Sequence, residues 1–416
     1  MNGPRVAYIL AKYPSLSENF IRREIEAVRR LGVAVDVYAL RKGDGEAAEA
    51  VYRDDIPTGE KIAATAWAAL RLPRFVAAVA RIVAMELGRP GDLARSLRNM
   101  PTAAAFARRI RRSGAVAVHA HFAGQPVIVA RNVSLLAGIP YTFSVHARDV
   151  FLEKADLRYG IRHAGAVAAC TQAATDRARE LAPPELRSRV CLVRHGLPAD
   201  EIARFEAAAK SAARGSSTVL MIGRLVEKKG VPVLLRAIAQ LRKEGCGIDC
   251  VILGDGPERA AIERLVDELH LRDLVKLPGW ATPDGVRDWM ARAALLAVPS
   301  IVAGDGDRDG LPNVILEAAA ARLPVVGAAA GGIGEFVTDE STGLLVPPGD
   351  AAALAAAIKR LADDERLRST LAEGAYQKLQ REYCAERNAA FLINVMEWRA
   401  APIEHAPAIA QAGQET

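Results

Sequence analysis

Short runs of apolar residues alternate along the chain with longer segments in which apolar residues recur every three or four positions. Residues 6–10 form the first run, and a helical pattern over residues 21–31 follows it; residues 218–222 and 233–241 repeat the arrangement. Runs that are apolar throughout, with helices between them, are typical of strands buried on both faces of a parallel sheet. The pattern therefore predicts an α/β fold of the doubly wound kind.

The same reasoning assigns elements over the whole chain. Strands are predicted at residues 6–10, 34–39, 116–122, 140–145, 166–171, 189–194, 218–222, 249–253, 275–280, 323–328 and 343–346. Helices are predicted to begin at Pro312 and to span residues 351–363, 365–382 and 383–400. Residues 401–416 contain two prolines without apolar periodicity, which predicts a flexible tail.

Length and composition narrow the class of protein. A chain of 416 residues is too long for one hydrophobic core, so two domains of about 200 residues each are expected. The five cysteines form no Cys-x-x-Cys pair, and no signal peptide precedes residues 6–10. No apolar run approaches the roughly 18 residues that span a bilayer. We therefore expect a protein of the reducing cytoplasm, in which any contact with the inner face of the membrane is peripheral.

Charge is distributed unevenly between the two halves of the chain. Residues 1–196 contain 30 Lys and Arg against 18 Asp and Glu, and the remainder contains 25 against 31, so the net charges are +12 and −6. This asymmetry favours an anionic partner for the first half, with nucleic acid, phospholipid and a lipid-linked diphosphate as candidates. We expect no nucleic-acid partner, because no recognised binding motif accompanies the charge.

The basic residues are concentrated in residues 61–112, where 11 Lys and Arg stand against two acids. Apolar faces lie beside several of the arginines, which predicts an amphipathic helical insert. One interpretation is that the insert lies on an anionic membrane surface, held by about 1 kcal/mol per surface arginine. The alternative, that these are the solvated faces of ordinary packed helices, fits the sequence equally well.

A site for a phosphorylated ligand is predicted between residues 299 and 350. Pro312 has the φ angle of a first helical turn and good helix formers follow it, so a helix begins there. The unpaired N–H groups of that turn and its partial positive charge suit a phosphate. Glu317 lies about 7.5 Å further along the helix, where its carboxylate could accept hydrogen bonds from a ribose. The turn at Gly331 and Gly332 adds further accessible amides.

The same stretch carries a resemblance to a known family. Two acids with seven residues between them, Asp309 and Glu317, are followed by Leu323-Pro324-Val325-Val326 and by Gly331-Gly332-Ile333-Gly334-Glu335. This combination resembles the donor site of the family 4 retaining glycosyltransferases. The opening Pro14-x-x-Ser17-Glu18-x-Phe20 is similar to that of glycosyltransferases of colanic-acid-like exopolysaccharides. Two positions depart from the family: Asp309 stands where glutamate is usual, and Gly334 where proline is common.

The resemblance implies the GT-B architecture, in which two Rossmann-like domains face each other across a cleft and a C-terminal helix crosses back to the first domain. Residues 195–200 are similar to the interdomain link of the family. This implies an acceptor-binding domain over residues 1–196, a nucleotide-sugar-binding domain over residues 197–382, and a returning helix over residues 383–400.

The resemblance also implies the donor site. The catalytic set is His146, Arg224, Lys229 and Asp309, in which the two cations clamp the diphosphate, Asp309 holds sugar hydroxyls and His146 contacts the sugar or its phosphate. The C-terminal end of a strand, where His146 is predicted, is also where open α/β sheets present ligands. The other donor-binding residues are Gly223, Gly256, Pro278, Gly279, Trp280, Gly310, Leu311, Pro312, Asn313, Val314 and Glu317. Of these, residues 278–280 are expected to contact the nucleotide base. Core packing is an alternative for Trp280.

On the acceptor side we expect Ser15, Ser17, Glu18, His121, Arg148 and Asp149. Ser17 with Asn19 is equally well explained as the cap of the first helix. The turn Gly254-Asp255-Gly256 fits the glycosyltransferase family better than a dinucleotide fingerprint, because Arg259 replaces the third glycine.

Metal-binding interpretations compete with this site. Residues 305–310 begin like a calcium loop, but Leu316 occupies the position of the loop's glutamate. Asp305-Gly306-Asp307 also resembles the metal-binding acid pair of the other large glycosyltransferase fold, which lacks the later phosphate cradle. His119 and His121 share one face of a predicted strand, as in some hydrolase metal sites, but few further ligands follow. We expect no metal and no other cofactor.

The implied reaction transfers a sugar, with retention, from a UDP- or GDP-linked donor to a glycan or polyprenyl-diphosphate-linked acceptor in exopolysaccharide biosynthesis. Fixed positive charge and helix dipoles would stabilise the diphosphate leaving group. Two alternatives stay open. A nucleotide-sugar epimerase of GT-B shape would need no acceptor, and a non-catalytic membrane-associated adaptor would tolerate loss of Lys229 or Glu317. The sequence identifies neither the sugar nor the acceptor.

Overall fold

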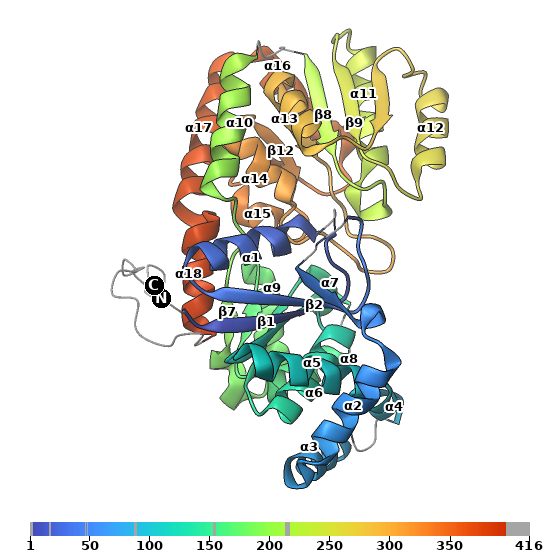
Figure 1. The fold of residues 1–416 in the computed structure, drawn as a ribbon. Helices are drawn as coiled ribbons and strands as arrows, with labels where there is room; N and C mark the ends of the chain where they lie inside the picture. Colours follow the sequence, from blue (N-terminus) through green and yellow to red (C-terminus); the bar gives the residue numbers. More distant parts are fainter. Residues whose placement is uncertain are drawn as a thin grey trace.

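The computed structural model describes residues 3–15, 18–45, 47, 49–86, 90–152, 155–212 and 217–396. The chain forms two parallel β-sheets with helices packed around each, and one sheet lies above the other in Figure 1. The α/β class and the pair of Rossmann-like units predicted from the sequence are confirmed.

The first sheet has the strand order β3-β2-β1-β4-β5-β6-β7, and all of its neighbouring strands are parallel. Its strands are β1 (Arg5–Leu10), β2 (Ala34–Ala39), β3 (Ala50–Tyr52), β4 (Ala117–His121), β5 (Tyr141–Val145), β6 (Val167–Ala169) and β7 (Val190–Leu192). Strands β4 and β5 are buried along their whole length, which explains their continuous apolar character. The chain order reverses between β1 and β4, where a parallel sheet opens a crevice at its carboxyl edge.

The second sheet repeats this topology with the order β10-β9-β8-β11-β12-β13. Its strands are β8 (Thr218–Ile222), β9 (Asp249–Leu253), β10 (Val275–Gly279), β11 (Leu295–Val298), β12 (Val325–Ala328) and β13 (Leu344–Val346). The predicted bounds of β2, β8 and β9 are confirmed residue for residue. Strands β3 and β11 were not predicted: β3 is a three-residue edge strand, and β11 follows its helix after only two residues.

Helices connect the strands and cover the sheets. They are α1 (Asn19–Arg30), α2 (Thr58–Ala69), α3 (Leu72–Glu86), α4 (Pro90–Arg98), α5 (Met100–Ser113), α6 (Gln125–Ala137), α7 (Ala147–Phe151), α8 (Ala155–His163), α9 (Gln172–Leu181), α10 (Ala199–Ser211), α11 (Val231–Lys243), α12 (Arg259–Glu268), α13 (Pro283–Arg292), α14 (Asn313–Ala320), α15 (Ile333–Phe336), α16 (Ala351–Asp363), α17 (Glu365–Glu382) and α18 (Ala385–Val395). The predicted bounds of α16 and α17 are confirmed residue for residue.

The end of the chain returns to the first sheet. Helix α17 runs along the second sheet, and α18 continues from it to pack beside α1, as the red and blue helices show in Figure 1. Leu197 exchanges backbone hydrogen bonds with Tyr383 and Ala385. These bonds join the segment that leads into the second half of the chain to the segment that returns from it. Gly196 is needed there, because a Cβ atom would lie 2.6 Å from the Ala385 nitrogen. The predicted crossing back is confirmed, and the predicted tail at residues 401–416 lies outside the described residues.

Helices α2 to α5 form the predicted insert between β3 and β4. Helix α3 lies at the end of the molecule that is farthest from the second sheet in Figure 1. The insert has several exposed large hydrophobic side chains, among them Leu70 at 86%, Ile62 at 66% and Val76 at 53% exposure. In the described part of the chain, no helix combines the length and the apolar character that crossing a membrane would need.

Candidate active site at the facing strand ends

Asp309 lies in a charged pair in the loop between β11 and α14. Its Oδ2 atom accepts hydrogen bonds from Lys229 Nζ at 2.8 Å and from the Ser300 hydroxyl at 2.9 Å, and Lys228 Nζ lies 3.6 Å from Oδ1. Burial raises the pKa of the Asp309 carboxyl, but the charges of Lys229 and Lys228 and the hydrogen bonds from Lys229 and Ser300 together hold the pKa below its ordinary value. The predicted phosphate-binding cation and the predicted sugar-binding acid are therefore in direct contact.

Lys229 reaches Asp309 from a 3₁₀ turn, η4 (Glu227–Lys229), that follows β8. Its side chain passes Gly223, where a Cβ atom would lie 3.4 Å from Lys229 Cε. Arg224 is exposed, and its guanidinium forms no hydrogen bond or ion pair with the residues that the structure describes. The two predicted cations thus differ, since an acid positions Lys229 while Arg224 remains accessible to a ligand.

The predicted phosphate-binding helix starts one residue later than expected. Pro312 is the cap of α14, with φ −61° and ψ 128°, and Asn313 is the first helical residue. Leu311 and Val314 are partly buried on either side and pack against the core of the second sheet. The apolar contacts anchor the turn. Ile315 N–H already donates to the Pro312 carbonyl, so Asn313 and Val314 have the N–H groups that an anion would bind.

The Gly331-Gly332 turn packs directly on the Asp309 loop. Gly332 N–H donates to the Gly310 carbonyl at 2.9 Å, and Gly331 has a φ of 59° that favours glycine. A Cβ atom on Gly310 would lie 3.6 Å from the Cβ atom of Ala147, the residue after His146. The predicted cradle of the second sheet therefore lies against the residue that follows the predicted catalytic histidine of the first.

Two other predicted donor-binding glycines hold loops in close approach. A Cβ atom on Gly256 would lie 2.3 Å from the Leu225 carbonyl oxygen, and the Gly279 carbonyl accepts a hydrogen bond from Gly254 N–H at 2.8 Å. Their contact with a nucleotide stays a prediction. Pro278 is exposed and Trp280 is 63% exposed, so the alternative that Trp280 is core packing is wrong.

His146 is the middle member of a chain of hydrogen-bonded side chains. Its Nε2 lies 3.2 Å from His121 Nδ1, and its Nδ1 lies 3.4 Å from His195 Nε2. His121 Nε2 in turn lies 3.1 Å from Glu24 Oε1, which also accepts a hydrogen bond from the Tyr8 hydroxyl. Glu24 comes from α1, His121 ends β4, and the other two histidines follow β5 and β7, so four elements meet here.

Burial and neighbouring charges shift the pKa values of several groups in this row of side chains. Burial lowers the pKa of His146 well below its ordinary value and lowers that of His195 to about 4. For Glu24, burial acts to raise the pKa, but the charge and hydrogen bond of His121 prevail and lower the pKa to about 2. A carboxylate therefore anchors the chain of imidazoles, and the contacts of both ring nitrogens give His146 a fixed orientation. Sequence reasoning missed Glu24 and His195 as site residues.

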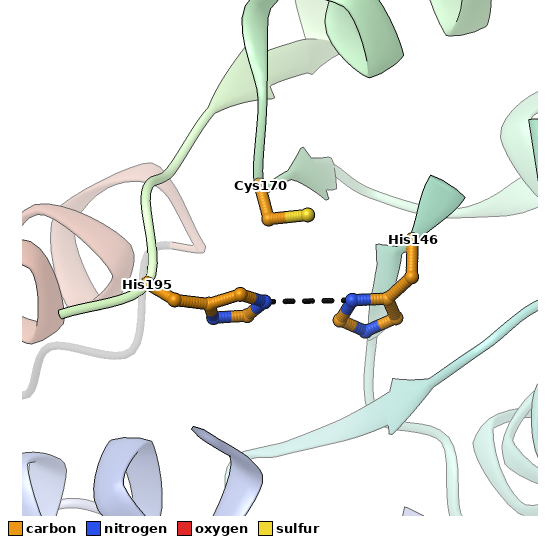
Figure 2. A group of neighbouring side chains, drawn as sticks. All are labelled: His146, Cys170 and His195. Carbon is orange, nitrogen blue, oxygen red and sulfur yellow. Dashed lines mark hydrogen bonds between the residues drawn. The ribbon is translucent and has the colours of Figure 1, made fainter. Parts of the chain in front are cut away.

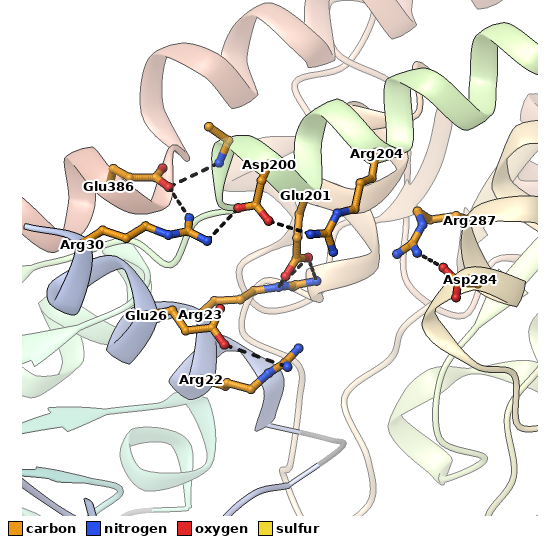
Figure 3. A network of polar contacts seen from close by, with 11 residues as sticks. Arg22, Arg23, Glu26, Arg30, Asp200, Glu201, Arg204, Asp284, Arg287 and Glu386 are labelled. Atoms are coloured by element: carbon orange, nitrogen blue, oxygen red, sulfur yellow. Dashed lines mark hydrogen bonds and ion pairs between the residues drawn. The ribbon is translucent and has the colours of Figure 1, made fainter. Parts of the chain in front are cut away.

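Glu317 is paired across the two halves of the molecule. Arg23 of α1 donates to Glu317 Oε1 at 2.8 Å and to Glu201 Oε2 of α10 at 2.6 Å, and the Arg23 side chain is almost fully buried. Figure 3 shows Arg23 extending from α1 to Glu201. The predicted ribose-binding acid therefore also holds the first half of the chain, through an arginine that sequence reasoning missed.

The structure places the predicted acceptor-side residues in different environments. Arg148 is exposed, Ser15 and Glu18 are half-buried, and Ser17 lies outside the described residues. Asp149 is buried and accepts a hydrogen bond from His146 N–H at 3.0 Å. His121 is buried with both ring nitrogens engaged, as described above. Glu18 occupies the N-cap position of α1, but its side chain accepts no hydrogen bond from the first turn. Asn19 is the first helical residue and therefore is not the cap.

Two groups in the described part of the chain have donor atoms close enough for a metal ion: His146 with Cys170 and His195, and Glu24 with His119 and His121. The Asp305–Gly306–Asp307 stretch belongs to neither. Lys228 Nζ lies 3.2 Å from Asp307, which disfavours a cation at that position.

The sequence matches two family profiles over most of its length. Residues 17–201 match the profile described as Glycosyltransferase Family 4, and residues 216–364 match that described as Glycosyl transferases group 1. The glycosyltransferase WcaL of Escherichia coli, named for colanic acid biosynthesis, is 28% identical over 382 residues, which cover 87% of this chain and 92% of WcaL. The alpha-D-kanosaminyltransferase of Streptomyces kanamyceticus is 29% identical over 298 residues, 64% of this chain and 73% of that protein.

A solved structure shares the fold. HepE of Anabaena, in complex with UDP, superposes with a TM-score of 0.67 at 18% identity, covering 95% of this chain and 99% of HepE. The facing Rossmann-like units, the returning helix and the two profile matches agree with one another. The chain therefore belongs to the family 4 glycosyltransferases and has the GT-B fold.

Proposed function

We propose that the protein transfers a hexose, with retention, from a nucleoside diphosphate sugar to a glycan or polyprenyl-diphosphate-linked acceptor during exopolysaccharide assembly. The observation that carries the proposal is the contact between the cradle at Gly310 and the residue after His146, which joins donor-type and catalytic-type groups from opposite sheets. The name of WcaL supports polysaccharide assembly, and the UDP bound to HepE supports a UDP-linked donor over a GDP-linked one.

The proposed chemistry depends on charge that develops on the leaving group. Negative charge grows on the nucleoside diphosphate as the glycosidic bond breaks, so fixed positive groups there lower the barrier. Lys229 has three N–H donors, of which one binds Asp309, leaving the others for the diphosphate. Arg224 and the N–H groups at the start of α14 add to this stabilisation. No metal ion is required in this scheme.

The sugar and ribose are positioned by acids in the same loop and helix. Asp309 accepts hydrogen bonds from sugar hydroxyls, and Glu317 accepts them from the ribose through the oxygen that Arg23 does not hold. His146, fixed by His121, contacts the sugar from the first sheet. We assign no covalent nucleophile, and retention rests on the family to which the chain belongs.

The proposal is tested by incubating the purified protein with UDP- and GDP-sugars and bacterial lipid extract, with and without EDTA. Mass spectrometry follows the nucleoside diphosphate and the glycosylated lipid. We expect transfer from one donor, unaffected by EDTA, and a loss of about 100-fold to 1,000-fold in Lys229→Ala. Glu317→Ala is expected to weaken donor binding.

Lys243→Ala, at the exposed end of α11, is the matched control and should retain full activity. Transfer that EDTA abolishes would contradict the metal-independent scheme. Sugar interconversion without an acceptor would identify an epimerase. No turnover of any donor, together with lipid binding that Lys229→Ala leaves unchanged, would identify a non-catalytic adaptor.

We also propose that the insert contacts an anionic membrane surface. The exposed Leu70 and Val76 lie among basic residues of α2 and α3, and Arg71 stacks on Trp67 at 4.6 Å from the ring centroid. The protein should sediment with vesicles that contain an anionic lipid and should not sediment with neutral vesicles. Leu70→Ser with Arg71→Ser should lower sedimentation, whereas binding that is indifferent to lipid charge would contradict the proposal.

A further inference from the structure

Three potential metal ligands converge beside the candidate active site. His146 follows β5, Cys170 follows β6 and His195 lies shortly after β7, so three neighbouring parallel strands present them at one edge of the sheet. Their donor atoms all lie within 4.8 Å of one another, and the Cys170 side chain points toward the space between the two rings (Figure 2). We propose that these residues bind a divalent cation of the zinc class.

The spacing of the donor atoms is close to that of a tetrahedral zinc site. Two imidazole nitrogens bound to zinc at about 2.0–2.1 Å lie about 3.3–3.4 Å apart. His146 Nδ1 and His195 Nε2 are 3.4 Å apart. A thiolate about 2.3 Å from the ion would lie about 3.6 Å from each nitrogen, so Cys170 Sγ needs to move by roughly 1 Å at most. Small side-chain rotations therefore complete three ligand positions.

The surrounding hydrogen bonds prepare His146 for this role. Glu24 accepts a hydrogen bond from His121 Nε2–H, so in neutral His121 the Nδ1 atom accepts one from His146 Nε2–H. That leaves the Nδ1 atom of His146 with its lone pair directed toward His195. Histidine ligands of metals commonly donate their other N–H to such a partner, and a carboxylate at the end of the chain increases ligand basicity.

The other candidate metal group, Glu24 with His119 and His121, has no ring nitrogen left free to bind an ion in this way. The ring nitrogens of His119 lie 2.9 Å from the Thr142 hydroxyl and 3.0 Å from the Ser144 hydroxyl, so both are engaged. Glu24 and His121 are already bonded to each other. The set of two imidazoles and one thiolate selects zinc over magnesium or calcium, which prefer oxygen ligands.

Binding has a simple proton balance. The ion replaces the proton shared by His146 Nδ1 and His195 Nε2, and that proton moves to His195 Nδ1 by a change of tautomer. The Cys170 thiol becomes a thiolate bound to the ion, and its proton passes to the buffer. A fourth position stays open for water.

Zinc in this site would prevent His146 Nδ1 from contacting a sugar and would therefore inhibit transfer. This consequence rests on the proposed function, whereas metal binding does not.

The test uses the full-length, reduced protein after removal of metals with EDTA and dialysis. Calorimetric titration with Zn²⁺ should show one ion per chain, with a heat that depends on the buffer because one proton is released. Co²⁺ should give a thiolate-to-cobalt absorption band. Cys170→Ala and His195→Ala should abolish the site, and Glu24→Gln should weaken zinc binding by about 10-fold to 100-fold.

Cys191→Ala, which removes a thiol from β7 of the same sheet, is the matched control and should bind zinc as the wild type does. Zinc should raise the unfolding temperature of the wild type and of this control but not of Cys170→Ala, which also shows that each variant folds. Equal zinc binding by wild type and Cys170→Ala, or no thiolate band with Co²⁺, would overturn the proposal. If transfer is detectable, zinc should inhibit the wild type more than Cys170→Ala.

Discussion

Asp309 illustrates how one side chain can be stabilised by the same neighbours that its proposed binding role needs. The carboxylate is 8% exposed, and Lys229 and Ser300 compensate for the loss of water around it. An aspartate at this position keeps the carboxylate close to Lys229, and this contact is also what gives it a lowered pKa. The two groups that the proposed reaction needs at the sugar and at the diphosphate therefore stabilise each other when no ligand is present.

The pH dependence of stability should show this pair. Because the pKa of Asp309 is lowered in the folded protein, its contribution is present above the unfolded pKa of about 3.9 and is lost as pH falls through the folded value. Asp309→Asn should lower the free energy of unfolding by about 1–3 kcal/mol at pH 7 and by less at pH 3, measured with urea. Asp273→Asn, which removes an exposed partner of Arg242, should leave stability nearly unchanged. An Asp309→Asn deficit that grows toward low pH would contradict this assignment.

At the scale of single elements, the start of α14 depends on a second loop. The turn at Gly331 supports the Asp309 loop so closely that a Cβ atom would lie 1.8 Å from the Asp309 carbonyl oxygen. The helix alone supplies N–H groups, but the neighbouring turn determines where the loop before the helix lies. The predicted phosphate cradle thus consists of two loops at the carboxyl ends of β11 and β12.

Gly331→Ala should therefore disturb the cradle. Gly349 has a similar positive φ, 79° against 59°, but a Cβ atom there would meet nothing within 4 Å. Both Gly→Ala changes should cost about 1 kcal/mol of backbone strain, and only Gly331→Ala should add a steric clash. Chemical denaturation should show the larger loss for Gly331→Ala, and calorimetry should show weaker nucleoside diphosphate binding. Equal behaviour of the two variants would show that the turn is not tightly packed.

At the scale of the whole molecule, a few polar contacts join the two halves. Arg23 links α1 to Glu201 and Glu317, and Glu335 of α15 accepts hydrogen bonds from Gln172 and Ala173 N–H at the start of α9. On the same side of the molecule, Arg30 contacts residues of α10 and α18, as Figure 3 shows. These contacts hold the cradle against the histidine chain, and a ligand that uses Glu317 must share it with Arg23.

Arg23→Met should loosen this arrangement. Removing the guanidinium leaves two largely buried carboxylates without their cation, which should destabilise the protein by about 3–5 kcal/mol. Small-angle X-ray scattering should show a larger radius of gyration, and thermal unfolding should begin earlier. Arg22→Met is the control, because its partner Glu26 is 3.9 Å away on the exposed face of the same helix. An unchanged radius and stability in Arg23→Met would show that other contacts hold the two halves.

The sequence by itself determined most of the elements and the start of α14. The apolar runs identified β2, β8 and β9 to the residue, because most positions of these strands are buried and select apolar side chains. The helix start at Pro312 was placed to within one residue, because proline restricts its own φ and lacks an N–H. Such signals are local, so no tertiary information is needed to find them.

Only the tertiary structure decided which distant residues meet. Glu24 was one of two acids in a predicted helix, and His195 was part of a predicted link, until the fold joined both to His146, Glu24 through His121. Arg23 and Glu317 are 294 positions apart and pair only because α1 packs between the two halves. Partners of a buried charge are chosen by desolvation and by the three-dimensional packing of elements, and neither leaves a periodic trace along the chain.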